Sequence, residues 1–201
     1  MILFLKKGKE QMYSKVYSAA IQGIAMEIVA VETDVSDGLP SFEMVGLLNS
    51  EVKEARERVR SAIKNTGYLL PPKRITVNLS PADIRKEGSS FDLPIAVSIL
   101  TSLGLVCKNN GDDEKILVAG ELSLSGNILP MNGVLPMILA AREKGIRKAI
   151  VILPSGNISS KRHPKCRYSF SSIEITKIEP WGFNNFLAIF NRFCIIESHL
   201  L

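Results

Sequence analysis

The sequence predicts an α/β fold of the mixed α+β kind, a mixed sheet with helices packed on it. Short runs of β-branched or alternating apolar residues predict strands, and longer segments with apolar residues three and four positions apart predict helices. The two kinds of segment alternate as far as about residue 154, which is the pattern of a sheet covered by helices.

Each strand is predicted from an apolar run that ends at Gly, Pro or a polar turn. The run "ILVAGELSLSGNIL" predicts a pair of strands about the turn at Ser125, Gly126 and Asn127, and "KAIVILP" predicts a buried strand. The expected strand regions are residues 14–23, 25–35, 41–46, 73–81, 116–129 and 148–154.

Three helices are expected, near residues 50–65, 91–103 and 133–144. Asn49 or Ser50 can cap the first, which carries a charged outer face. The second is apolar almost all round, so we expect it to be buried.

Composition indicates a soluble globular chain with one domain and a tail, or two small domains. The chain has 201 residues, of which 46% are hydrophobic and 22% charged. The net charge of +5 permits contact with nucleic acid but does not require it. No apolar run reaches the roughly 18 residues that span a bilayer, so we expect no membrane contact.

Cysteine and histidine patterns favour neither disulfides nor a metal. Cys107, Cys166 and Cys194 are odd in number and lack C-x-x-C spacing, which fits a reducing cytoplasm. His163 and His199 are separated from each other and from any partner with ligand spacing, so we expect no metal site.

The character of the sequence changes near Asn157. We therefore divide the chain into an N-terminal extension (1–11), one domain (12–157) and a divergent C-terminal tail (158–201). The tail is expected to be either a helix docked on the domain or an out-of-frame or degenerate end.

Five segments in order carry a resemblance to a known family: "MYSKVYSAAIQGI", "VETDVSDGLPSFEMVGL", "EVKEARERVRSAIKNTGY", "ITVNLSPADIRKEGSSFDLPIAVSIL" and "GELSLSGNILPMNGVLPMILAAREKG". Together they resemble the N-terminal domain of the magnesium-chelatase-like ATPases, the family of YifB and competence protein ComM. The resemblance implies a Lon-protease-like domain of the ribosomal-protein/GHMP-kinase type. It also implies a longer, oligomeric protein, so we expect this chain to be a truncated gene product, a fragment or a partner subunit.

The resemblance implies ATP and magnesium for the family's ATPase module alone. That module follows this domain in the family, whereas here the divergent tail takes its place. The sequence contains no G-x-x-x-x-G-K-[ST] loop, so we expect no cofactor in this chain.

The resemblance to Lon proteases raises the question of a serine nucleophile. Those enzymes place a serine in a turn that resembles "KEGSSFD", and a lysine at the start of a later helix removes its proton. Ser90 falls at the serine position, whereas Leu135 occupies the lysine position and cannot accept a proton. We therefore interpret Ser90 as vestigial, with its hydroxyl or that of Ser89 capping the helix that begins near Phe91.

Basic residues give a second candidate site. On the first helix they recur at steps of three or four, and others flank the next strand, so a surface that contacts DNA phosphates is one interpretation. The alternative is a solvated face, because glutamates alternate with the cations on the helix. The candidates are Lys53, Arg56, Arg60, Lys64, Lys73, Arg74, Arg85 and Lys86.

Two hypotheses of function follow. The first is a non-catalytic Lon-like domain that acts as a scaffold or DNA-contacting module in the DNA processing of competence and recombination. The second is a residual Lon-like serine peptidase. Leu135 at the position of the base favours the first.

Overall fold

The computed structural model describes residues 12–23, 25–106, 115–151 and 174–177. The N-terminal extension and the expected boundary at Asn157 lie outside the described residues. The elements are β1 (Tyr13–Gln22), β2 (Ala25–Ser36), β3 (Ser41–Val45), α1 (Ser50–Asn65), β4 (Arg74–Ser80), the 3-10 helix η1 (Ser89–Phe91), α2 (Asp92–Ser102), β5 (Ile116–Ala119), β6 (Glu121–Leu122), β7 (Ile128–Leu129), α3 (Val134–Glu143), β8 (Lys148–Val151) and β9 (Glu174–Lys177).

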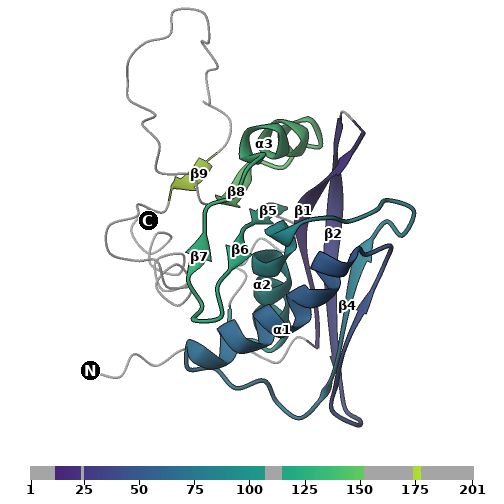
Figure 1. The fold of residues 1–201 in the computed structure, drawn as a ribbon, viewed down its shortest axis with the longest axis vertical. Coiled ribbons are helices and arrows are strands. Elements are labelled where there is room, and N and C mark those ends of the chain that lie inside the picture. Colours follow the sequence, from purple (N-terminus) through teal and green to yellow (C-terminus); the bar gives the residue numbers. More distant parts are fainter. Residues whose placement is uncertain (1–11, 24, 107–114, 152–173, 178–201) are drawn as a thin grey trace, which may run out of the picture.

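A mixed sheet forms the centre of the fold (Figure 1). The strand order is β3-β4-β2-β1-β5-β8-β9, and β6 and β7 form a separate hairpin. β2 is antiparallel to both of its neighbours, whereas the other adjacent strands of the large sheet run parallel. The predicted mixed sheet with helices packed on it is confirmed. β9 falls in the segment that we assigned to the tail.

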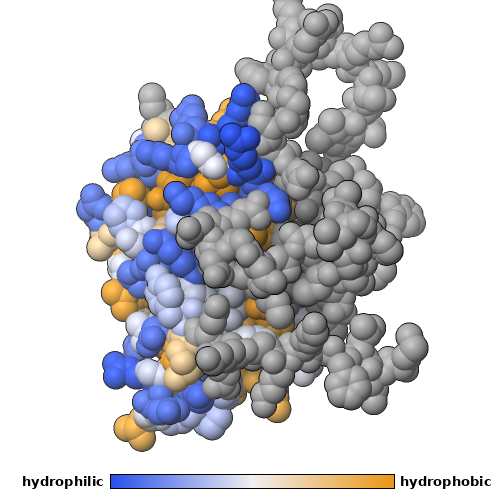
Figure 2. All heavy atoms as spheres, turned by 180° about the vertical axis from the view of Figure 1, so that it is seen from behind, coloured by the Kyte–Doolittle hydropathy of each residue, from blue (hydrophilic) through white to orange (hydrophobic). Residues whose placement is uncertain are grey.

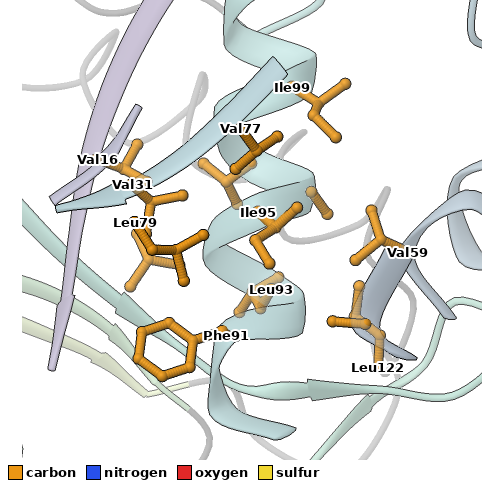
Figure 3. Packing of buried hydrophobic residues seen from close by; sticks show 14 of the residues in the cluster. Val16, Val31, Val59, Val77, Leu79, Phe91, Leu93, Ile95, Ile99 and Leu122 are labelled. Atoms are coloured by element: carbon orange, nitrogen blue, oxygen red, sulfur yellow. The ribbon is translucent and has the colours of Figure 1, made fainter. Parts of the chain in front are cut away.

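Helices cover both faces of this sheet. Successive strand residues point to opposite faces, and in β5 Val118 packs with α1 and α2 whereas Leu117 and Ala119 pack with α3. Figure 3 shows α2 with sheet residues such as Leu79 on one side and Val59 of α1 on the other. The serine turn and the start of α3 therefore belong to opposite faces.

The first predicted helix is confirmed with its bounds. The side chain of Asn49 caps α1 by accepting a hydrogen bond of 3.0 Å from the N–H of Val52. Five apolar residues of α1 are buried, and burial of a valine such as Val59 contributes about 1.5–3 kcal/mol. α1 therefore forms because one face is apolar and its first turn is capped.

The second helix differs at its start. The turn η1 precedes α2, which begins at Asp92 and ends at Ser102. All eleven residues of α2 are buried, which confirms the expectation from its apolar sequence. The third helix also forms within one residue of the expected bounds.

The expected strand pair over residues 116–129 is divided between two sheets. β5 joins the large sheet, and only β6 and β7 form the hairpin. The division falls at Gly120, whose N–H donates to the carbonyl of Ser90 and whose carbonyl accepts from Leu93. Side-chain atoms of Leu93 and Ile128 leave little room for a Cβ at Gly120, about 3 Å away.

The part of the sheet not covered by α3 presents polar residues. There the Glu32 carboxylate accepts from the Tyr13 hydroxyl (3.2 Å) and from Asn78 (3.1 Å), and it pairs with Lys15 (3.1 Å). Figure 2, from behind, shows hydrophilic and hydrophobic residues interspersed over the described part. Among the described helices, none is long and apolar enough to cross a membrane.

Candidate functional site

The serine turn, residues 86–92, lies between α1 and the end of β5. On one side the N–H of Gly88 donates to the Glu51 carboxylate (3.0 Å). On the other side the N–H of Gly120 donates to the carbonyl of Ser90 (3.1 Å). Gly88 has φ of 83°, a value that favours glycine. The turn is thus fixed from both sides.

The capping role that we expected for Ser89 and Ser90 is wrong. Neither η1 nor α2 has a side-chain cap, and the N-cap position of α2 is taken by Phe91. The Ser89 hydroxyl instead donates to the Glu121 carboxylate at 2.6 Å. Ser90 is 8% exposed, and among the described residues its hydroxyl has no hydrogen-bond partner.

An ion pair that the sequence reading missed holds the start of α2. Arg58 donates from Nε to Asp92 Oδ2 (2.7 Å) and from Nη2 to Asp92 Oδ1 (2.9 Å). Asp92, which has no exposed surface, also accepts from the N–H of Leu122 (3.3 Å). Arg58 lies one turn before Ala62, at the border of the buried face of α1. This position in the sequence could have indicated that Arg58 has a buried partner.

Burial raises the pKa of the Asp92 carboxyl, and the Arg58 guanidinium offsets part of this rise. In return, the hydrogen bonds to Asp92 raise the pKa of Arg58. Arg58 therefore favours the ionised form of Asp92 against the effect of burial.

Within α3, no lysine lies at the position of the proton acceptor expected from Lon proteases. Leu135 lies in the first turn of α3 and is 49% exposed. Lys144 follows the last residue of α3, at the opposite end of that helix. The geometry thus offers Ser90 no base from α3.

The structure corrects one of the residues that we predicted to contact DNA, Lys86. Its side chain is completely buried, and its ammonium donates to the carbonyl of Pro81. Burial lowers the pKa of Lys86, and the charge of Asp83 opposes that shift. Because a buried ammonium cannot reach a phosphate, Lys86 leaves the candidate set.

The other cations differ in their partners. Within the described ranges, three are paired with acidic side chains: Arg56 with Glu57 (3.1 Å), Lys73 with Asp37 (3.5 Å) and Arg85 with Glu87 (2.7 Å). Lys53, Arg60, Lys64 and Arg74 are exposed, and the described residues give them no acidic partner.

Four of the cations form a basic flank on α1: Lys53, Arg56, Arg60 and Lys64. At about 100° per residue these positions lie within about 80° of one another. Arg58 lies on the opposite flank, against Asp92. The basic flank therefore faces away from the serine turn.

Metal ligands are not grouped in the described part of the chain, where no three His, Cys, Asp or Glu residues come together. His163, His199 and the three cysteines fall on residues that the structure does not describe.

Comparison with known proteins identifies the family. The family described as subunit ChlI of Mg-chelatase matches residues 31–157, more than half of the chain. Competence protein ComM of Haemophilus influenzae is 43% identical over 145 residues, which are 72% of this chain and 28% of that protein. The uncharacterized protein YifB of Escherichia coli is 44% identical over 138 residues, 69% of this chain and 27% of YifB.

A more distant similarity supports the fold. A Lon protease of Methanosphaera stadtmanae is 26% identical over 153 residues, 71% of this chain and 17% of the protease. A mixed sheet with a serine turn, similar to part of a Lon protease, defines a Lon-like domain. The chain belongs to the magnesium-chelatase-like family of ComM and YifB, and it spans little more than a quarter of the length of those relatives.

Proposed function

We propose that this chain provides the Lon-like domain of a ComM-like ATPase and contacts DNA without catalysis of its own. The observation that carries the proposal is the basic flank of α1, which is exposed and faces away from the serine turn. Glu51 and Glu54 lie outside the arc of the basic flank, whereas Glu57 lies about 20° beyond its edge and pairs with Arg56. Lys53, Arg60 and Lys64 have no acidic partner among the described residues. This arrangement favours a phosphate-binding surface over a uniformly mixed, solvated face.

Binding by this surface depends on salt and not on DNA sequence. Cations that neutralise phosphates release counterions, so three contacts from Lys53, Arg60 and Lys64 would give a slope of log K against log salt of about −2.7. Phosphate contacts of this kind position a duplex without reading bases.

Fluorescence anisotropy with labelled duplex DNA at several salt concentrations tests the proposal. Arg60→Ala with Lys64→Ala should reduce the magnitude of the slope by about 1.8. The matched control is Arg142→Ala with Lys144→Ala, which removes the same charge from exposed residues at the end of α3. Absence of salt-dependent binding, or an equal effect of the control, would leave the domain as a scaffold only.

The second candidate is the residual peptidase. Two observations favour it: the Ser90 hydroxyl has no partner among the described residues, and burial lowers the pKa of Lys86, as in lysines that act as bases. The missing base at Leu135 weighs against it. A fluorophosphonate probe that labels the wild-type chain but neither Ser90→Ala nor Lys86→Met would favour the peptidase over the DNA-contacting role.

In this proposal ATP and magnesium act in the ATPase module of the longer relatives, and no residue of this chain is assigned to hold them. In the same proposal the protein is an oligomer, and it lies in the cytoplasm together with the DNA that it contacts.

A further inference from the structure

Strand β3 is the last strand on one side of the large sheet. It pairs with β4, and no described residue pairs with its other edge. Unpaired edges are normally protected by lysines, prolines, bulges or a covering element, because they accept strands from other chains.

The backbone of β3 alternates between the two sides. Ser41 donates its N–H to the carbonyl of Lys73, next to β4. Since the direction of the backbone groups alternates along a strand, Glu43 and Val45 also face β4. Phe42 and Met44 then point their N–H and C=O groups to the outer edge.

The side chains of β3 give the edge little protection. The sequence from Ser41 to Val45 contains neither lysine, arginine nor proline, and Glu43 is its one charge. Val45 and Leu47 are about half exposed, at 51% and 49%. The edge therefore combines free backbone groups with accessible apolar surface.

We propose that β3 pairs with β3 of a second copy of this chain, antiparallel about a two-fold axis, with Met44 opposite Met44. In this register Glu43 lies opposite Val45 of the other copy, so no like charges are paired. Phe42 lies opposite Gly46, which follows the last residue of β3 and has φ of 135°.

Two other antiparallel registers also place outward-facing residues opposite each other, and both are energetically less favourable. Phe42 opposite Met44 places the two Glu43 carboxylates opposite each other, which is repulsive. Phe42 opposite Phe42 places Met44 opposite Pro40, which has no N–H to donate. This pairing is independent of the proposed contact with DNA.

Cysteine cross-linking tests the register in the full chain, with Cys107, Cys166 and Cys194 replaced by serine. Residues 43 and 45 of two copies form a non-hydrogen-bonded pair, with Cα atoms about 4.5 Å apart, close enough for a disulfide. Glu43→Cys with Val45→Cys should cross-link into dimers on mild oxidation. Either single-cysteine variant should give at least about tenfold less cross-linked dimer. Its cysteine then lies opposite the native Val45 or Glu43 of the other copy and not opposite a second cysteine. Equal cross-linking by Glu43→Cys alone would overturn the register.

Sedimentation velocity tests the association itself. Met44→Pro removes an outward N–H that β4 does not use, so the domain should keep its circular dichroism spectrum, with a lower melting temperature because Met44 also packs against the core. Self-association should weaken at least about tenfold, because the central hydrogen bonds of the pair are lost. A wild-type chain that stays monomeric, or a folded Met44→Pro variant that associates as the wild type does, would overturn the proposal.

Discussion

Replacement of Arg58 by methionine should be among the most destabilising single changes outside the hydrophobic core. The variant leaves the Asp92 carboxylate, which has no exposed surface, with the N–H of Leu122 as its hydrogen-bond donor. Removal of one partner from a buried ion pair costs about 3–5 kcal/mol, because the remaining charge is uncompensated. We expect a loss of that size in the free energy of unfolding at pH 7, measured by urea denaturation and far-UV circular dichroism.

The loss should depend on pH in a definite direction. The folded-state pKa of Asp92 is raised, so the folded protein binds this proton more tightly than the unfolded chain. Between the ordinary value of 3.8 and the raised value, the unfolded state therefore carries fewer protons, and the free energy of unfolding falls as pH rises. Without Arg58 the pKa rises further, so the variant should lose more stability than the wild type between about pH 4 and pH 7.

A double-mutant cycle separates the pair from other effects of Arg58. Arg58→Met combined with Asp92→Leu removes both charges and should recover most of the lost stability. A single variant that loses less than about 1 kcal/mol at pH 7, or whose loss is the same at pH 4, would refute the reasoning. The same conclusion would follow if the double variant were less stable than Arg58→Met.

Four further changes test other parts of the domain by the free energy of unfolding. Thr33→Val should stabilise by about 1 kcal/mol, because this buried hydroxyl has no partner among the described residues. Ser98→Ala should destabilise by about 1 kcal/mol, because its hydroxyl bonds to the Ser14 hydroxyl (2.8 Å) and to the Val31 carbonyl (3.3 Å). Gly126→Ala should destabilise by about 1–3 kcal/mol, because its Cβ would lie 2.2 Å from Cγ2 of Thr66 and its φ is +84°. Lys86→Met tests linkage at high pH: the lowered pKa of Lys86 makes wild-type stability rise with pH up to about 10.5, and equal pH dependence in the variant would contradict this.

The sequence predicted those parts of the fold that depend on local pattern. The bounds of α1 agree because its apolar spacing and the capping side chain of Asn49 act within a few residues. The burial of α2 agrees because its sequence is apolar all round. By contrast, the cap expected from Ser90 fails because a 3-10 turn moves the start of α2 to Asp92.

The candidate site was less predictable because its contacts join distant segments. Lys86 was assigned to the surface because lysine is almost never fully buried, and the carbonyl of Pro81 that accepts from its ammonium gives no signal in the sequence. The position of Arg58 at the border of the buried face of α1 could have indicated a buried partner, but nothing near it in the sequence identifies that partner as Asp92, 34 residues away. The exposed positions of Arg60 and Lys64 could be predicted, since helical spacing alone separates them from the apolar face.

The ion pair of Arg58 and Asp92 also constrains how this sequence can diverge. The two codons are 34 positions apart, and the order in which they change matters. Loss of Arg58 first leaves the Asp92 charge unpaired in the interior, whereas loss of Asp92 first leaves Arg58, whose side chain is 23% exposed, beside Glu54. A lineage that replaces the pair is therefore expected to lose Asp92 before Arg58.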